Sequence, residues 1–449
     1  MASLSRTMGT PTNAYKGTVS VWVKRCALTG NLGIFNGNAD VSNATDAYFN
    51  LDGTLSFYTN SGGTVDLKTT REFRDPAAWY HLVYAWDTTQ GSSTDRVKFY
   101  INGVQETLFS PATYPGSSQI LQTNISGNTF NVGVVQGGTG FDGYMAHFHF
   151  IDGLQYAASD FGSTDATSGI WIPNSAPSVT YGDNGLFLKF GSGALTTDSS
   201  GNSNTMSQSG TILATKDNAR NNFATWNPLS RDASDTGSLS NGNTTYSLSS
   251  YEYNVKSTLA MPSGKWYWEI KQTVDEETKI GVMTSGAIND LDTDSASFYW
   301  GSTGNGGLHM LTSSSGTSWD SRNNDTSQSS GTYTTAIATA PNSIIMVALD
   351  VDSGKMYMGV DGVWFNSSDP AAGTGQVMTI TNSSPDPLIP FCAFGSASSR
   401  VSQVNFGNGY FGTTDVTSAV ADGNGEGRFE YTPPTGFLAL CTNNLGSDS

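Results

Sequence analysis

Catalysis would depend first on where the carboxylates lie. Hydrolysis of a glycosidic bond needs two carboxylates facing one cleft, and residues two apart on a strand share a face. The run Glu-x-Asp-x-x-Glu does not occur in the sequence. Glu269 stands alone on its predicted strand, and residues 275–277, Asp-Glu-Glu, are typical of a solvated turn. The sequence therefore favours a protein without catalytic residues.

Histidines could bind a metal or act as bases. His147 and His149 lie two apart on a predicted strand, so they point the same way, which is a permissible start for a zinc site. No nearby residue completes such a site, because the chain has four His and no Cys with ligand spacing. We therefore interpret both as partly buried or surface histidines rather than as zinc ligands. No Ser-His-Asp set or phosphate-binding Gly loop can be defended either.

Asp290, Asp292 and Asp294 place three carboxylates at alternate positions. Calcium prefers such an oxygen-rich set of ligands, but the EF-hand register fails. Ser295 stands where the turn Gly belongs, and Gly301 stands where the bidentate Glu belongs. An acidic, solvated loop is the favoured interpretation, and calcium is the one ion left open. The sequence implies no other cofactor.

Sugar binding needs exposed aromatic rings beside polar groups on a loop face. Trp300, Trp319 and Trp364 lie near turn-rich segments and are the candidates for stacking on a sugar. The alternative for each is packing in the core, which is the common role of Trp in a sandwich.

The charge of the chain limits its partners. Lys and Arg number 21 against 38 Asp and Glu, which gives a net charge of −17. Phosphate backbones and anionic membranes would be repelled, so nucleic acid and membrane surfaces are excluded as partners. Three scattered Cys do not make a disulfide framework. Residues 1–10 lack a secretory signal, and no later segment is long enough to insert into a bilayer.

The elements that must position these residues are strands. Helical periodicity is almost absent, whereas alternating or continuously apolar runs recur between clusters of Gly, Asn, Asp and Ser. The run of residues 79–86 is apolar on both faces, which predicts a central strand covered by a partner sheet and by loops. Asp52-Gly53 and Asn102-Gly103 predict hairpins. The predicted class is all-β.

The length predicts two cores, because single cores stop growing well below 449 residues. We assign residues 1–190 to a first domain, 191–221 to a polar linker and 222–449 to a second domain. One sequence pattern occurs in both domains. A strand ending in Asp87 precedes an alternating strand and Asn102-Gly103, and a strand ending in Asp350 precedes an alternating strand and Asp361-Gly362. Both halves are therefore predicted to be antiparallel β-sandwiches.

Several sequence segments also resemble those of known protein families. The strand at 17–23, the run at 79–86 and Phe99-Tyr-Ile-Asn-Gly-Val104 make residues 1–190 similar to a laminin-G-like or concanavalin-A-like jelly roll. Residues 222–449 resemble a SPRY domain by Gly264-Lys-Trp-Tyr-Trp-Glu269, Ile280-Gly-Val282 and Pro390-Phe-Cys-Ala-Phe394. The joining phrases are similar to those of tailed-phage proteins: Ala158-Ser-Asp-Phe-Gly162, Gly169-Ile-Trp-Ile-Pro-Asn174, Asn221-Asn-Phe-Ala-Thr-Trp-Asn-Pro228 and Tyr431-Thr-Pro-Pro-Thr-Gly-Phe437.

The resemblance implies a virion protein of the tail-fibre or capsid-surface class. Such a protein would be made in the host cytoplasm and would present lectin-like sandwiches to host surface glycans or to other virion proteins, as a homo-oligomer in the particle. The alternatives are a capsid decoration or adaptor protein with no host ligand, and a polysaccharide depolymerase, against which the missing carboxylate pair argues. Fold analogy alone assigns no ligand.

Overall fold

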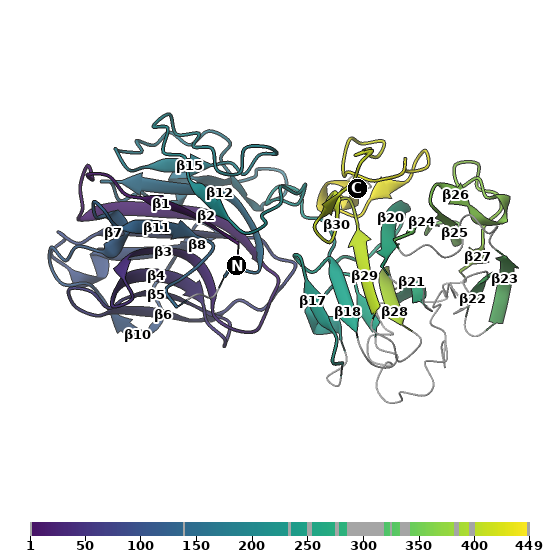
Figure 1. The fold of residues 1–449 in the computed structure, drawn as a ribbon, viewed down its shortest axis with the longest axis horizontal. Coiled ribbons are helices and arrows are strands. Elements are labelled where there is room, and N and C mark those ends of the chain that lie inside the picture. The colour runs from purple at the N-terminus through teal and green to yellow at the C-terminus, as the bar shows by residue number, and fades with distance from the viewer. Residues whose placement is uncertain are drawn as a thin grey trace. The chain divides into compact units, whose positions relative to one another are not determined.

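The computed structural model divides the chain into two units of β-structure (Figure 1). Unit 1 comprises residues 1–214 and 218–220, and unit 2 comprises residues 215–217 and 221–449. The structure describes residues 2–137, 140–231, 235–248, 254–273, 278–284, 318–323, 326–332, 342–380, 386–394 and 400–446. The sheets of both units are built almost entirely from antiparallel pairs, which confirms the predicted all-β class.

Unit 1 contains an eight-stranded and a six-stranded sheet. The larger sheet has the order β10 (Phe109–Thr113), β6 (Val65–Glu72), β5 (Thr54–Thr59), β4 (Asn43–Phe49), β3 (Leu32–Asp40), β11 (Thr129–Val132), β1 (Ser3–Thr7), β16 (Ser207–Ser209). The smaller sheet has the order β15 (Leu186–Leu188), β12 (Gly143–Asp152), β2 (Lys16–Arg25), β7 (Tyr80–Asp87), β8 (Val97–Ile101), β9 (Val104–Glu106). Strands β13 (Gly162–Thr164) and β14 (Trp171–Pro173) form a separate pair.

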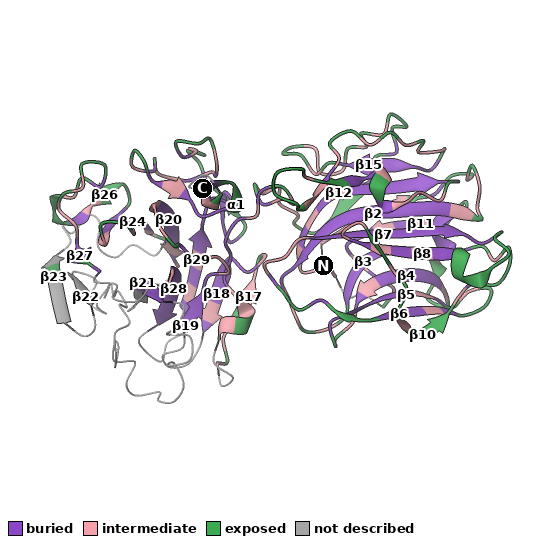
Figure 2. Ribbon diagram, turned by 180° about the vertical axis from the view of Figure 1, so that it is seen from behind, coloured by how far each residue is buried: buried purple, intermediate pink, exposed green. Residues whose placement is uncertain are grey.

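The core of unit 1 lies between these two sheets. Alternate residues of each strand point inward, as a pleated strand requires, and both sheets contribute to one buried cluster. Phe57 of β5 lies 5.8 Å from Tyr84 of β7, and Phe35 of β3 lies 5.3 Å from the same ring. Every residue of β7 is buried (Figure 2), which confirms the predicted central strand.

A second apolar layer covers the outer face of the six-stranded sheet. Val83 and Ala85 of β7 and Ile151 of β12 are buried there beneath Ala158 and Phe161. We call residues 156–181 the unit 1 cover segment, and it includes the short helix Ala158–Asp160 and the β13–β14 pair. The expectation that loops cover one face of the central strand is therefore confirmed.

The polar stretch predicted as a linker differs from that expectation, because residues 191–214 belong to unit 1. Strand β16 extends the eight-stranded sheet by pairing with β1. Asp198 accepts hydrogen bonds from the backbone of Phe187, Ser200 and Asn204. Hydrogen bonds between polar side chains and the backbone, rather than packing of an apolar face, therefore hold this segment in unit 1.

Unit 2 contains a nine-stranded and a three-stranded sheet. The main path is β17 (Ser238–Ser240), β18 (Thr245–Leu248), β29 (Arg400–Asn405), β20 (Lys265–Gln272), β24 (Ile344–Asp350), β25 (Lys355–Val360), β26 (Val363–Trp364), with β27 (Met378–Thr379) beside β25 and β32 (Leu438–Ala439) beside β20. The three-stranded sheet has the order β19 (Asn254–Lys256), β28 (Leu388–Phe394), β21 (Thr278–Thr284), and the remaining pairs are β22 (Ser318–Asn323) with β23 (Thr326–Thr332) and β30 (Tyr410–Phe411) with β31 (Thr414–Asp415).

The core of unit 2 joins the nine-stranded and three-stranded sheets. Trp268, Cys392 and Phe394 are buried in one cluster, and Tyr246 stacks on Phe394 with centroids 5.4 Å apart. A second cluster lies on the other face of β20 and β24, beneath Phe429, Phe437 and Cys441. We call residues 429–441 the unit 2 cover segment.

The only α-helix among the described residues is one turn, α1 (Thr442–Leu445). No described helix reaches the length and hydropathy needed to span a bilayer. Cys26, Cys392 and Cys441 are buried, and none of the three forms a disulfide.

Candidate functional site

The outer face of the eight-stranded sheet carries a continuous row of polar side chains. Residues paired in register across the sheet put their side chains on one face. The row, which we call the polar row, crosses every strand of the sheet in the order Ser207, Ser5, Asn131, Asn36, Asp46, Tyr58, Asp66, Thr113. Seven strand spacings of about 4.8 Å give it a length of about 34 Å.

Hydrogen bonds fix the middle of the polar row. The Asn36 amide donates to Asp46 Oδ1 at 2.7 Å, and Asn131 donates to Asn36 Oδ1 at 3.0 Å. The backbone N–H of Gln136 also donates to Asp46 Oδ1, at 2.9 Å. Because an ionised carboxylate can only accept, Asp46 sets the direction of the whole chain of donors. These side chains are therefore held in place before any ligand arrives.

Acceptor groups on the polar row are left open. Asp46 is only 7% exposed, yet its Oδ2 atom accepts no hydrogen bond from any residue that the structure describes. On the next strands, the Tyr58 hydroxyl and the Asp66 carboxylate are half-buried and likewise have no hydrogen-bond partner within the described ranges. None of these oxygens is among the described side-chain atoms that are both buried and unpaired, so each can be reached by water or by a ligand that brings donors.

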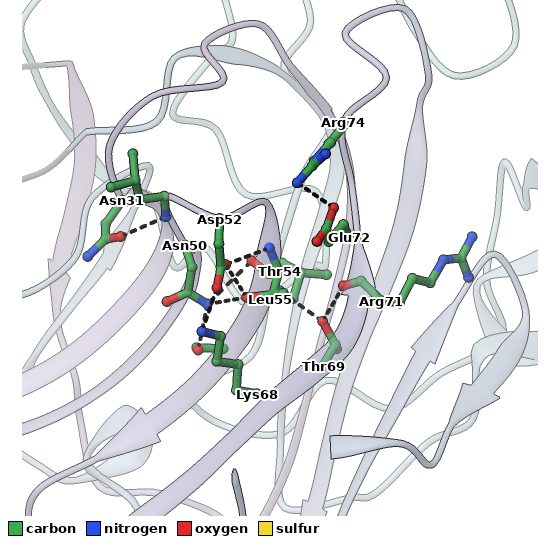
Figure 3. A network of polar contacts seen from close by, with 12 residues as sticks. Asn31, Asn50, Asp52, Thr54, Leu55, Lys68, Thr69, Arg71, Glu72 and Arg74 are labelled. Carbon is green, nitrogen blue, oxygen red and sulfur yellow. Dashed lines mark hydrogen bonds and ion pairs between the residues drawn. The ribbon is translucent and has the colours of Figure 1, made fainter. Parts of the chain in front are cut away.

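A second row runs beside the first, with Tyr48, Ser56 and Lys68 in register. This second row is tied to the turn after β4, because Asn50 donates to Ser56 Oγ at 2.8 Å. Figure 3 shows the neighbouring contact, in which Lys68 Nζ lies 2.7 Å from Asp52 Oδ2. The same network continues to Thr54, which donates to Asp52 at 2.6 Å. Lys68, the one basic side chain of the two rows, is thus already paired.

The carboxylates of this face titrate differently according to their surroundings. Burial raises the pKa of Asp46, although hydrogen bonds from Gln136 and Asn36 oppose that shift. Burial also raises the pKa of Asp66, and nearby Lys68 opposes it. Its hydrogen bond from Lys68 lowers the pKa of Asp52 to about 2. At the two row carboxylates burial outweighs the opposing interactions, whereas at Asp52 the hydrogen bonds outweigh burial.

A buried Ser–His pair lies on the six-stranded sheet, but it has the wrong protonation for catalysis. Ser20 Oγ is 2.8 Å from His81 Nε2, and Trp171 Nε1 donates to His81 Nδ1 at 2.9 Å. Because an indole N–H only donates, Nδ1 must be the acceptor, and the ring proton is on Nε2. His81 therefore donates to Ser20 and cannot take its proton. Burial lowers the pKa of His81 to about 3, which keeps the ring neutral.

The two histidines of β12 behave as structural residues. His149 Nδ1 is 2.9 Å from the Tyr181 hydroxyl, and its ring stacks on Phe187 with centroids 3.9 Å apart. His147 lies at an irregularity of the strand with a φ of 47°. In the part of the chain that the structure describes, no three His, Cys, Asp or Glu residues are arranged to hold a metal ion.

None of the residues predicted from the sequence belongs to the polar row. Trp364 ends β26 and packs, partly buried, against the apolar cluster beneath the unit 2 cover segment, together with Tyr431. Trp319 belongs to β22, and its side chain lies outside the described structure. Trp300, the Asp290, Asp292 and Asp294 set, and residues 275–277 also lie outside the described residues.

The site residues that the sequence reasoning missed are Asp46, Tyr58 and Asp66. Each occupies the polar side of an alternating strand, and that alternation was the available clue. What the sequence could not give was the register, which places Asn131 beside Asn36 although 95 residues separate them.

Comparisons with known proteins agree with the fold. Residues 3–158, about a third of the chain, match a family model described as the concanavalin A-like lectin/glucanases superfamily. This part of unit 1 is therefore similar in sequence to the concanavalin A-like lectin/glucanases superfamily. Among curated proteins, none matches the chain.

Solved structures that are similar to parts of the chain include SPRY domains, a domain of an arabinanase and a pentraxin. The SPRY domain of human HERC1 is 14% identical, with 40% of this chain and 96% of that chain covered and a TM-score of 0.27. Domain 4 of AbnA, a GH43 extracellular arabinanase from Geobacillus stearothermophilus in complex with arabinotriose, is 23% identical, with 32% and 64% covered and a TM-score of 0.27. A heptameric SAP-like pentraxin from Limulus polyphemus is 18% identical, with 39% and 87% covered and a TM-score of 0.27.

Proposed function

We propose that the chain is a non-enzymatic carbohydrate-binding protein and that unit 1 holds a glycan on the polar row. The observation that carries this proposal is the free Oδ2 of Asp46, a carboxylate oxygen on a nearly buried side chain beside the half-buried ring of Tyr58. Sugar hydroxyls supply donors for such oxygens, and a Tyr ring supplies an apolar surface for the sugar face. The preset Asn131, Asn36 and Asp46 chain reduces the entropy lost on binding.

Three variants test the proposal on a glycan array with the full chain. Tyr58→Ala removes the ring, and Asp46→Asn replaces the free oxygen by an amide while retaining the Oδ1 acceptor. Both are expected to lower the apparent affinity for bound glycans about tenfold or more. Asp183→Asn is the matched control, because Asp183 is exposed and its carboxylate has no hydrogen-bond partner among the described residues. Equal binding by all variants would place the glycan elsewhere.

The setting we propose is the surface of a tailed-phage particle. The support for this is the set of joining phrases between and after the strands, which resemble those of phage proteins. Other virion proteins and further copies of this chain are the proposed partners, and host surface glycans are the proposed ligands. Labelled antibody against the chain, imaged on intact particles, tests the setting, and an unlabelled particle from cells that make the protein would refute it.

The alternative within this class is a decoration or adaptor protein without a host ligand. It is favoured if no glycan binds the native chain while the antibody labels the capsid. Release of reducing ends from a bound polysaccharide would instead support a depolymerase and overturn the non-enzymatic assignment.

A further inference from the structure

The polar row offers acceptors in excess of donors. Asp46 Oδ2, the Asp66 carboxylate and the Tyr58 hydroxyl oxygen are open, and the amides of Asn131 and Asn36 already donate within the row. The hydroxyl of Tyr58 can also donate, but both carboxylates can only accept while ionised. A ligand that fits this stretch must therefore bring N–H or O–H donors.

The arrangement around Tyr58 also favours positive charge. Asp46 and Asp66 are paired with Tyr58 from the strands on either side, so one aromatic ring stands between two carboxylates. A cation on an aromatic ring is attracted by the ring, and carboxylates strengthen that attraction. Lys68 cannot neutralise the pair fully, because Asp52 already holds its Nζ at 2.7 Å. A carboxylate or sulfate on the ligand would meet two like charges and no free cation in these two rows.

On the basis of the proposed glycan binding, we infer that the polar row selects glycans by charge. Glycans with free amino groups bind most tightly, neutral glycans bind more weakly, and uronic-acid or sulfated glycans are rejected. The ammonium lies at Tyr58 between Asp46 and Asp66, and the flanking sugar hydroxyls donate to the remaining oxygens.

The inference is tested with the full chain on an array that carries amino-sugar, neutral, uronic-acid and sulfated glycans, read at about pH 6, where sugar amines are largely protonated. We expect the amino glycans to bind about tenfold more tightly than neutral glycans of the same backbone. Asp66→Asn should reduce that ratio toward one and lower the binding of neutral glycans much less, because it removes a charge and leaves an acceptor. It should leave the fold intact, since Asp66 has no hydrogen-bond partner among the described residues.

Control variants distinguish a site from general attraction to an acidic protein. Asp183→Asn removes the same charge from an exposed position, so the ratio should stay at its native value. Equal loss in Asp66→Asn and Asp183→Asn would overturn the inference, as would equal binding of neutral and sulfated glycans. Binding of no glycan at all would instead overturn the proposed function on which the inference rests.

Discussion

The two units place corresponding strands in the same order. In unit 1, β12, β2, β7, β8 and β9 lie side by side, and in unit 2 the sequence is β29, β20, β24, β25 and β26. In each unit the first strand of this series comes late in the sequence and pairs with a strand that comes earlier. The next strand in the sheet is a central one that ends in Asp. Both central strands then pair with an alternating strand that closes on a tight turn. The sequence pattern that occurs in both domains thus corresponds to a shared arrangement of five strands.

The way each unit fastens its cover segment is where they differ. Counting from the Lys at the start of β2 and β20, Ser20 and Glu269 occupy equivalent positions on the outer face. In unit 1 the link is neutral and passes from Ser20 through His81 to Trp171. In unit 2 the Glu269 carboxylate accepts the backbone N–H groups of Glu430 and Tyr431 directly, at 2.9 and 2.7 Å. The equivalent position therefore holds the cover segment in both units, through a neutral hydroxyl in unit 1 and through a carboxyl group in unit 2.

The largest expected effect comes from replacing one acceptor oxygen of that link in unit 2. Glu269 is fully buried and also bonds to Tyr267 and Asn405. Glu269→Gln puts an N–H₂ group among donors and should cost about 3 kcal/mol. Ser20→Ala in unit 1 removes one neutral hydrogen bond and should cost about 1 kcal/mol. Hydrogen exchange of peptides from residues 429–441 and 156–181 measures both, and equal losses would refute the contrast.

The turns beneath the two cover segments give the next effect. Gly103 and Gly362 have φ values of 83° and 85°, each after a residue that also has positive φ, as a type I′ turn requires. A Cβ on Gly103 would lie 2.8 Å from the ring of Trp171, and one on Gly362 would lie 3.1 Å from the ring of Tyr431. Each turn is therefore the surface on which a covering ring rests.

Gly103→Ala and Gly362→Ala should both destabilise their units, but unequally. The positive φ costs each variant about 1 kcal/mol, and the closer ring in unit 1 adds overpacking of about 1 to 2 kcal/mol. We expect about 2 to 3 kcal/mol for Gly103→Ala and less for Gly362→Ala, measured by denaturant unfolding followed through exchange of each cover segment. A larger loss in unit 2 would show that the ring of Tyr431 yields less than that of Trp171.

These features also show what the sequence could and could not predict. Periodicity predicts β7 and β24, and Asn-Gly or Asp-Gly predicts their turns, because both depend on neighbouring residues. Periodicity does not predict that residues 191–214 belong to unit 1. They are held there by hydrogen bonds between side chains and backbone groups, such as those that Asp198 accepts. The Asp52-Gly53 turn predicts that β4 and β5 pair, but periodicity does not predict that Asp66 and Asn131 join the same row, nor that Trp171 is the partner of His81.

A change of pH should act on the two cover segments in opposite directions. Burial raises the pKa of Glu269 to about 7 from an ordinary 4.5, so its folded form binds a proton more tightly than the unfolded form. The stability it contributes is present below about pH 4.5 and is lost as pH rises through 7. The pKa of His81 is lowered to about 3 from 6.5, so its contribution is present above about pH 6.5 and is lost as pH falls toward 3.

Acidification from about pH 7.5 to 5.5 should therefore stabilise residues 429–441 and destabilise residues 156–181, each by about 1 to 2 kcal/mol. Hydrogen exchange corrected for the intrinsic pH dependence measures both segments in one sample. Ser20→Ala provides the control, because it leaves His81 buried and should keep the sign in unit 1. If acidification changed the stability of both cover segments in the same direction, Glu269 and His81 would not titrate as their surroundings imply.

The smallest expected effect concerns the ion pairs that the two units share. Lys16 lies 3.0 Å from Asp87, and Lys265 lies 3.2 Å from Asp350, with each lysine side chain about one-third exposed. Solvent screens such pairs, so Lys16→Met should cost about 0.5 kcal/mol. Lys265 additionally lies over the Phe437 ring of its cover segment, 5.6 Å from the centroid. Lys265→Met should therefore cost slightly more, up to about 1 kcal/mol, and the excess should disappear in a Phe437→Leu background. Since both aspartates retain their turn bonds to Thr89 and Ser353, a loss well above this in either unit would mean that the lysine, rather than the turn, fixes the end of the central strand.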